Sequence, residues 1–538
     1  MTPHTPTASA QSLPRLRRRV GDERVAALAL ALLGVLFGAL MLYVARGTTF
    51  FFDEWDFLLN RRGISSESLL APHNGSLSLA PVVLFKGLLQ IAGADGHWLF
   101  RLTLLALHLT AVVLTFRLIS RRATTVTAAL GATLILVIGR SADNLIWPAQ
   151  LAFLLAIVGG LTALAGLDRD DRRGELLACG GLILGLASSS VAIPFAAVAA
   201  VQIACEPGRR RRIWVVAVPL ALYGAWSLRF GDSQLNVQNI VQVPAFATTM
   251  AANAAGAVFG LDVQWGRTLL IVAVAALALW FVRGGPVSAR MMGLLAGLLT
   301  MWTLTALARA GISEPTVPHY TYASAVLGLL VAAEAVGRTP LRARTVGVAS
   351  AVVLLAVALG AASVWQRGAE LRADSADVRA RLAAMALAGT AVPFDFRPVP
   401  RQPQVVAGRV QVAQRDFGRI ALPLAQLPRA PAAQRDAADD VLRRLLTPRV
   451  LALPARPRPG SCPPARGELP FAGAGRGLVI AAPAGAELRL RAFADAPAAV
   501  VAIPSPGALV RPAPGGRAIA WKATIVGAGT IRACSVAE

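Results

Sequence analysis

Apolar stretches long enough to cross a membrane recur from residue 25 to residue 364 of this 538-residue chain. The hydrocarbon core of a bilayer is about 30 Å thick, so a spanning helix needs about 20 mostly apolar residues. In addition, 55% of the residues are hydrophobic and only 15% are charged. The sequence therefore predicts a polytopic α-helical membrane protein. We expect about eleven spans, at residues 25–44, 98–119, 124–138, 151–167, 176–187, 191–205, 213–228, 269–282, 291–307, 320–336 and 346–364.

The formal net charge of +24 comes almost entirely from arginine, since the chain has only two lysines, Lys86 and Lys522. The arginines form short clusters between apolar stretches, as at Arg121 and Arg122 and at residues 209–212. Cytoplasmic loops of membrane proteins carry this excess of basic residues. The charge therefore indicates an integral membrane protein with a cytoplasmic N-terminus, and it does not favour nucleic acid as a partner.

The apolar pattern divides the chain into four parts. Residues 1–24 are expected to be a cytoplasmic tail, 25–365 the transmembrane domain, 366–470 an extracytoplasmic region with helices and many prolines, and 471–538 an extracytoplasmic β-rich domain. Short alternating segments between turn residues, such as 488–493, favour a small β-sandwich there. Cys462 and Cys534 bracket this region, and an oxidising compartment would allow them to pair; two unpaired buried thiols are the alternative.

Three carboxylates, Asp53, Glu54 and Asp56, follow the first apolar stretch directly and are surrounded by aromatic residues. Acidic groups at a bilayer edge lose hydration, so they usually have a partner, a ligand or a proton-transfer task. On a helix Asp53 and Asp56 share a face, whereas Glu54 points about 100° away. A solvated cap at the end of the first helix is the alternative interpretation.

Two further polar groups lie on the side of the membrane where these acids are expected. His73 and Asn74 follow Pro72 in the first long loop, and with Asp53 and Asp56 the imidazole of His73 could hold a divalent cation such as Mg²⁺ or Mn²⁺, or orient a sugar. A histidine with ordinary loop hydrogen bonds is the alternative.

The second group follows a late span and contains Arg309, His319, Tyr320 and Tyr322. Guanidinium groups bind phosphate in a bidentate way, and tyrosine hydroxyls add donors, so this segment could hold a phosphate at headgroup depth. Tyrosines and arginines are also common at membrane interfaces without any ligand. We expect the acids and this segment to face one shared cavity.

Taken together, these features resemble the GT-C superfamily of integral membrane glycosyltransferases, in particular actinobacterial-type enzymes that use polyprenyl-phosphate sugars. The resemblance lies in the layout of residues 20–365 and in two short motifs, 52–56 and 309–322. It implies an enzyme of a bacterial cytoplasmic membrane that moves a sugar, with inversion, from a polyprenyl-phosphate donor to an extracytoplasmic glycan or glycolipid acceptor of the cell envelope.

The resemblance also implies roles for residues. Asp53 would be the general base, Glu54 or Asp56 would bind the sugar or a divalent ion, and Arg309, Tyr320 and His319 would hold the lipid phosphate. The four-residue acidic motif departs from the family's lone acid or Asp-x-Asp, which leaves the catalytic carboxylate open. Two other functions fit the chain: a transporter or flippase of lipid-linked glycans, for which His108 is the main candidate inside a span, and a membrane anchor that presents a carbohydrate-binding module.

Overall fold

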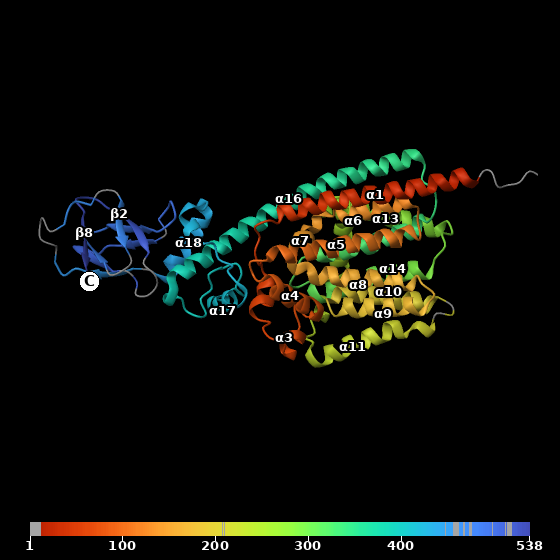
Figure 1. The fold of residues 1–538 in the computed structure, drawn as a ribbon, viewed down its shortest axis with the longest axis horizontal. Helices are drawn as coiled ribbons and strands as arrows, with labels where there is room; N and C mark the ends of the chain where they lie inside the picture. The colour runs from red at the N-terminus through yellow and green to blue at the C-terminus, as the bar shows by residue number, and fades with distance from the viewer. Residues whose placement is uncertain are drawn as a thin grey trace, which may run out of the picture. The chain divides into compact units, whose positions relative to one another are not determined.

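The computed structural model describes residues 12–206, 208, 210–446, 448–455, 462–465, 468–472, 476–497, 499–511, 513 and 519–537. Residues 1–11 of the expected N-terminal tail lie outside this set. The chain forms two compact units (Figure 1). The first contains residues 1–46, 61–88 and 98–370, and the second contains residues 47–60, 89–97 and 371–538.

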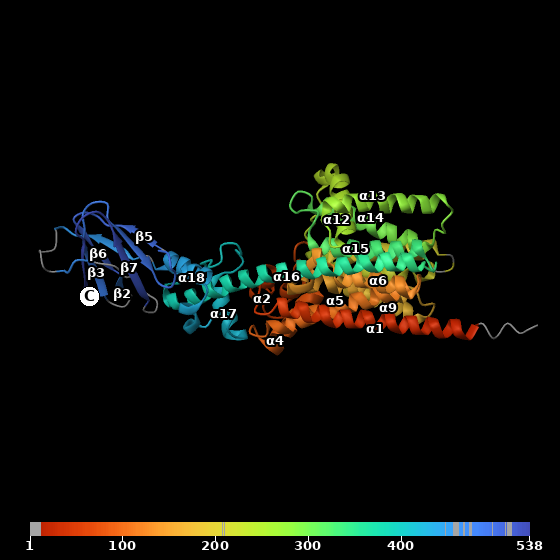
Figure 2. The ribbon, with the colours of Figure 1, turned by 90° about the horizontal axis from the view of Figure 1, so that it is seen from above.

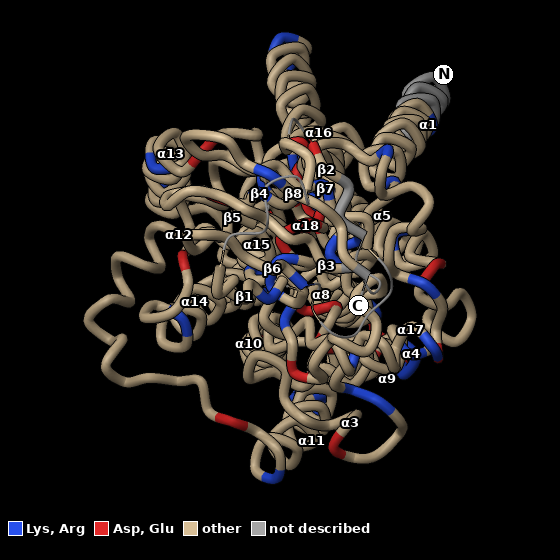
Figure 3. The backbone as a smooth tube through the Cα atoms, turned by 90° about the vertical axis from the view of Figure 1, so that its left-hand side faces the viewer, with Lys and Arg blue, Asp and Glu red and all other residues tan. Residues whose placement is uncertain are grey.

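The first unit is a bundle of long helices that run side by side in both ribbon views (Figures 1 and 2). Most of the tube in Figure 3 carries neither acidic nor basic residues, as an apolar environment requires. The helices of this unit are α1 (Ser12–Val44), α5 (His97–Ser120), α6 (Thr125–Leu136), α7 (Ala142–Ile146), α8 (Leu151–Leu167), α9 (Arg172–Leu186), α10 (Ile193–Cys205), α11 (Trp214–Phe230), α12 (Val243–Ala257), α13 (Val263–Val282), α14 (Ala289–Arg309), α15 (Pro318–Val336) and the first part of α16 (Ala343–Ala388).

Nine helices among the described residues are long and apolar enough to cross a membrane. The chain is thus an integral membrane protein, but the expected number of eleven spans is not confirmed. The difference comes from the segments expected at 176–187 and 191–205, which form α9 and α10. These helices have 15 and 13 residues, or about 22 and 20 Å at about 1.5 Å per residue, which is shorter than the hydrocarbon core.

Helices α8 and α9 pack closely through glycines. A Cβ atom added to Gly159 of α8 would lie 2.5 Å from the carbonyl oxygen of Gly181 on α9, and one added to Gly166 would lie 2.6 Å from that of Gly174. Small residues at helix interfaces let the backbones approach closely. Membrane helices associate through such packing because the hydrophobic effect does not favour their association within the bilayer. The two helices therefore form one tightly packed pair.

The long first loop contains three helices, α2 (Asp53–Leu59), α3 (Ser66–Leu70) and α4 (Leu79–Ala92). Helix α2 contains the three carboxylates Asp53, Glu54 and Asp56 in its first turn. Helix α2 belongs to the second unit, whereas α3 and the residues of α4 up to Leu88 belong to the first.

Helix α16 is a single helix of 46 residues. The sequence predicts a span at 346–364 followed by an amphipathic helix at 366–389, and the structure joins them without a break. The expected helix at 432–446 is α18 (Ala432–Leu445), and α17 (Ala407–Phe417) precedes it in the second unit.

The β-rich end of the chain forms two antiparallel four-stranded sheets, ordered β1-β6-β3-β8 and β2-β7-β4-β5. Alternate side chains such as Leu488, Leu490, Val510 and Trp521 are buried, so each sheet has one apolar face, as in a sandwich. The strands are β1 (Arg449–Ala452), β2 (Glu468–Ala472), β3 (Arg476–Ala481), β4 (Glu487–Arg491), β5 (Ala499–Ala502), β6 (Gly507–Arg511), β7 (Ala520–Val526) and β8 (Arg532–Ala537).

One disulfide and one buried carboxylate stabilise this region. Cys462 and Cys534 form a disulfide, which confirms the expected pair. The carboxylate of Asp439 on α18 is fully buried and accepts hydrogen bonds from the backbone N–H groups of Ala492, Phe493 and Ala494, at 2.9 to 3.0 Å. The loop after β4 is therefore fixed to α18.

Candidate functional site

Helix α2 begins directly behind a strained residue. Phe52, which precedes the first acid, has φ 43° and ψ −109°. A bulky residue at positive φ is uncommon, and such strain persists only where the surroundings hold it. Here the N–H of Phe52 donates to Oε1 of Gln402 at 3.1 Å, and Gln402 is buried. The start of the acidic helix is therefore fixed by a residue from far along the chain.

Glu54 points into the interior of the second unit. Its side chain is fully buried; Oε2 accepts from the N–H of Phe51 at 3.0 Å, and Oε1 lies 3.0 Å from Nε2 of His97. His97 is itself 5% exposed, and the ring of Phe50 packs edge-on against it, with the centroids 5.1 Å apart. This pair satisfies a carboxylate in an apolar setting, so Glu54 anchors α2.

Asp53 and Asp56 lie on the other side of α2 and are half-buried, as helical geometry predicts. Oδ1 of Asp56 accepts from Nδ2 of Asn60 at 2.6 Å, and Oδ1 of Asn60 accepts in turn from Arg409 of α17. Two carboxylates of the three thus remain accessible at the start of the helix. The hydrogen bond from Asn60, which Arg409 contacts in turn, orients Asp56.

The first unit holds the remaining candidate residues. His73 and Ser76 form a two-residue hairpin through reciprocal backbone hydrogen bonds of 2.9 and 3.0 Å. Asn74 and Gly75 at its tip have φ values of 50° and 76°, the combination for which Asn-Gly is favoured in tight hairpins. The hydroxyl of Ser76 lies 2.8 Å from that of Ser190, which fixes the hairpin to the helix bundle.

Arg309 ends α14 and contacts this hairpin. Its guanidinium donates to the backbone carbonyl of Asn74 and also interacts with the hydroxyl of Tyr320. His319, next to Tyr320 at the start of α15, stacks on Phe153 with the ring centroids 4.0 Å apart. The structure thus brings together Asn74, Arg309, His319 and Tyr320, which come from three separate stretches of sequence.

Tyr322 lies apart from this group. It is fully buried, and its hydroxyl lies 3.0 Å from Nδ1 of His108, whose Nε2 lies 3.1 Å from the carbonyl oxygen of Leu136. His108 is therefore a core histidine with both ring nitrogens in hydrogen bonds, the plain alternative to a transport role. The contact links α5, α6 and α15 inside the bundle.

No group of three or more His, Cys, Asp or Glu side chains in the described part of the chain is placed to hold a metal ion. Asp53 and Asp56 belong to the second unit and His73 to the first. A divalent cation thus stays a prediction from the sequence.

Sequence reasoning missed His97, which lies 43 residues after Glu54. The only signal available was indirect: a carboxylate beside an apolar stretch requires a partner, and the chain has only five histidines.

Comparisons with known proteins give one result. No protein-family model matches the chain, and no curated protein sequence matches it. Among solved structures it is similar to ArnT from Cupriavidus metallidurans, crystallised with undecaprenyl phosphate. The match has 13% sequence identity and a TM-score of 0.45, and it covers 74% of this chain and 90% of that chain. A likeness at this level assigns neither a family nor a function.

Proposed function

We propose that this protein is a membrane glycosyltransferase that moves a sugar from a polyprenyl-phosphate donor to a glycan or glycolipid acceptor on the extracytoplasmic side. The observation that carries the proposal is the difference in burial among the three carboxylates of α2. One carboxylate, Glu54, is consumed by a buried pair with His97, while Asp53 and Asp56 stay half-buried on the other side of the same short helix. An anchored helix that presents two carboxylates shortly after a membrane-length helix in the sequence suits proton transfer at the bilayer edge.

In this proposal Asp53 is the general base. It accepts the proton of an acceptor hydroxyl while that oxygen attacks the anomeric carbon of the sugar. The bond between the anomeric carbon and the phosphate oxygen breaks, its electron pair leaves with the polyprenyl phosphate, and the configuration inverts because only one displacement occurs. Asp56, oriented by Asn60, would accept hydrogen bonds from sugar hydroxyls, and Glu54 is a positioning residue.

Arg309, His319 and Tyr320 are the proposed phosphate-binding residues. Negative charge grows on the phosphate as the sugar leaves, and a guanidinium with a nearby hydroxyl stabilises that charge. The contacts of Arg309 with Asn74 and Tyr320 hold the guanidinium in place before the donor binds. The proposal does not give Tyr322 a contact with substrate, because its hydroxyl lies against His108 in the core.

A divalent cation is a separate part of the proposal. Asp53 and Asp56 would supply two oxygen ligands, and donor oxygens and water would supply the rest, which is how Mg²⁺ is commonly held. The proton transfer to Asp53 does not require the cation. Transfer measured before and after treatment with a chelator, with Mg²⁺ or Mn²⁺ added back, tests this part alone.

The experiment that tests the function uses the full chain in proteoliposomes with a panel of radiolabelled polyprenyl-phosphate sugars and envelope acceptors. Native protein should transfer one of these sugars, and Asp53→Asn should reduce the rate by at least about 100-fold, since general bases contribute about 10² to 10⁴. Asp232→Asn, a change of an exposed loop aspartate of the first unit, is the matched control and should keep full activity. Transfer by neither protein, with an unrelated glycosyltransferase active in the same assay, would overturn the proposal.

A further inference from the structure

An apolar groove runs along the first unit between α1 and α5. Its volume is about 630 Å³, and it is lined by residues of α1 from Ala27 to Leu42, residues of α5 from Leu105 to Arg117, and Leu136 of α6. Small residues of α1 form one wall; a Cβ atom added to Gly38 would lie 3.4 Å from the side chain of Leu105. Alanine and glycine make up five of the eight α1 residues that line the groove, which leaves room beside α5.

The groove is at least as long as one leaflet of a bilayer is thick. From Leu105 to Arg117, the α5 wall extends about 18 Å, and from Ala27 to Leu42 the α1 wall extends about 22 Å, at a rise of about 1.5 Å per residue. Half of a hydrocarbon core is about 15 Å thick. The groove therefore has room for an acyl chain of a lipid whose headgroup lies at one end of it.

Both walls reach a basic residue at the same end. Among the lining residues that the structure describes, Arg117 carries a charge, and it lies at the end of the α5 wall. On α1, the exposed Arg24 lies one turn before Ala27, where the α1 wall begins. Close approach of Gly34 to Leu109 and of Gly38 to Leu105 shows that the two helices run antiparallel here. The groove therefore has one positively charged end.

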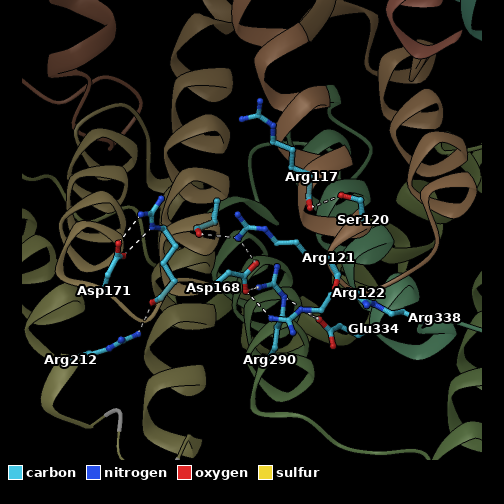
Figure 4. Close-up of polar contacts among 12 residues, drawn as sticks. Arg117, Ser120, Arg121, Arg122, Asp168, Asp171, Arg212, Arg290, Glu334 and Arg338 are labelled. Atoms are coloured by element: carbon cyan, nitrogen blue, oxygen red, sulfur yellow. Dashed lines mark hydrogen bonds and ion pairs between the residues drawn. The ribbon is translucent and has the colours of Figure 1, made fainter. Parts of the chain in front are cut away.

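The neighbouring ion pairs leave this end with a surplus of positive charge (Figure 4). Asp168 is shared by Arg121, Arg122 and Arg290, at 3.1, 2.8 and 2.6 Å. Glu334 is shared by two of the same arginines. Two carboxylates thus face three guanidiniums, and the side chains of Arg121 and Arg122 are still 45% and 40% exposed.

Arg117 takes no part in that network. In Figure 4 its guanidinium points away from Asp168, and the contact drawn to Arg117 is the one from the hydroxyl of Ser120 to its backbone carbonyl. Its position one turn before Arg121 places the guanidinium at the groove instead.

We propose that the groove binds an acidic glycerophospholipid of the leaflet at this arginine-rich end, with an acyl chain along α1 and α5 and the phosphate near Arg117 and Arg24. Clusters of basic residues beside membrane helices recognise anionic lipid headgroups through the surface charge, and guanidinium groups pair well with phosphate. The site is separate from the proposed donor site. Arg309 lies at the far end of α14 from Arg290, about 28 Å along the helix.

The test measures lipid binding to the full-length protein in detergent, by native mass spectrometry and by the thermal midpoint, with dioleoyl phosphatidylglycerol as the probe and dioleoyl phosphatidylcholine as its neutral counterpart. Native protein should bind and be stabilised by the acidic lipid in preference to the neutral one. Arg117→Gln should weaken the binding of the acidic lipid about fivefold, which is the effect of about one basic residue near an anionic lipid. Val113→Trp, which fills the groove, should weaken the binding of both lipids.

Two matched controls lie on α13, away from the groove. Arg283→Gln removes an arginine at the end of that helix, and Val274→Trp enlarges a residue that is 58% exposed, compared with 44% for Val113. Both controls should bind the acidic lipid as native protein does. Equal binding of the two lipids by native protein, or equal losses in the control variants, would overturn the proposal, as would polyprenyl phosphate competing for the groove more strongly than the acidic lipid.

Discussion

The Nε2 atom of His97 lies 3.0 Å from the Oε1 atom of Glu54, although the two residues are 43 positions apart, and neither side chain is more than 6% exposed. This pair fixes the acidic helix α2 to His97 within the second unit. It also explains how three carboxylates can lie so close together in an apolar setting, because one of them has a buried partner and the other two reach the surface.

The first prediction concerns this pair. Glu54→Ala or His97→Ala leaves a buried polar partner unsatisfied, so each should lower the free energy of unfolding by about 1 to 3 kcal/mol. In a double-mutant cycle the two changes should couple by about 0.5 to 3 kcal/mol. Thermal unfolding of the full chain in detergent measures this. Asp53→Ala, at a half-exposed position of the same helix, should change stability much less; additive effects of the two buried changes would contradict the pairing.

The second prediction concerns Arg309. Arg309→Lys keeps the charge but loses the fork that binds phosphate in a bidentate way. We expect the KM for the polyprenyl-phosphate donor to rise about tenfold or more, with a smaller change in thermal stability, in the transfer assay described above. Arg229→Lys at the end of α11 is the matched control, because Arg229 also ends a membrane-length helix but packs on the ring of Phe230. An unchanged KM in Arg309→Lys would remove Arg309 from the donor site.

The third prediction compares two adjacent glycines of α9. A Cβ atom at Gly181 would lie 2.6 Å from the carbonyl oxygen of Gly159, whereas one at Gly180 meets nothing within 4 Å. Alanine is favoured over glycine in a helix by about 0.8 to 1.0 kcal/mol. Gly180→Ala should therefore leave the protein unchanged or stabilise it, and Gly181→Ala should destabilise it by forcing α8 and α9 apart. In the same detergent, the thermal midpoint of Gly181→Ala should fall below that of native protein, whereas that of Gly180→Ala should stay the same or rise.

The fourth prediction concerns Asp439 and pH. Burial raises the pKa of Asp439, although three backbone N–H groups oppose this. A carboxyl group whose pKa is higher in the folded than in the unfolded state stabilises the fold below its unfolded pKa, and that contribution is lost as the pH rises through the folded value. Asp439→Asn removes this dependence. The variant should therefore be more destabilised relative to native protein near pH 4 than near pH 7.

Asp439→Ala provides the control for the hydrogen bonds themselves. It leaves the N–H groups of Ala492, Phe493 and Ala494 without their acceptor and should cost about 1 to 3 kcal/mol for each buried group left unsatisfied. Thermal unfolding at several pH values measures both variants. A larger loss for Asp439→Asn at neutral than at acidic pH would contradict the direction of the pKa shift.

Helical periodicity alone accounts for part of the candidate site. The opposite orientations of Glu54 and the two aspartates follow from the 100° turn per residue, and the structure has them so. The same rule explains Tyr322, which the sequence analysis grouped with Tyr320. Residues two apart on a helix do not share a face, and Tyr322 accordingly points to His108 in the core.

Contacts between distant segments could not be read from the sequence. His97 reaches Glu54, and Arg309 reaches Asn74 over 235 residues, only because the helices fold back on one another. The number of spans also could not be fixed from the sequence, for a related reason. Hydropathy identifies α9 and α10 as apolar, but the ends of these helices are set by local features such as the cap of Asp171 on the N–H of Gly174, not by apolar composition.

The close packing of α8 and α9 bears on how the protein reaches its membrane. A helix of 15 residues is a weak substrate for lateral release from the translocation channel by itself. Its partner α8 is more apolar, and their backbones touch through glycines that leave no gap for lipid. We therefore expect the two helices to enter the membrane together as a hairpin. A side chain added at their contact would first reduce the integration of this hairpin into the membrane.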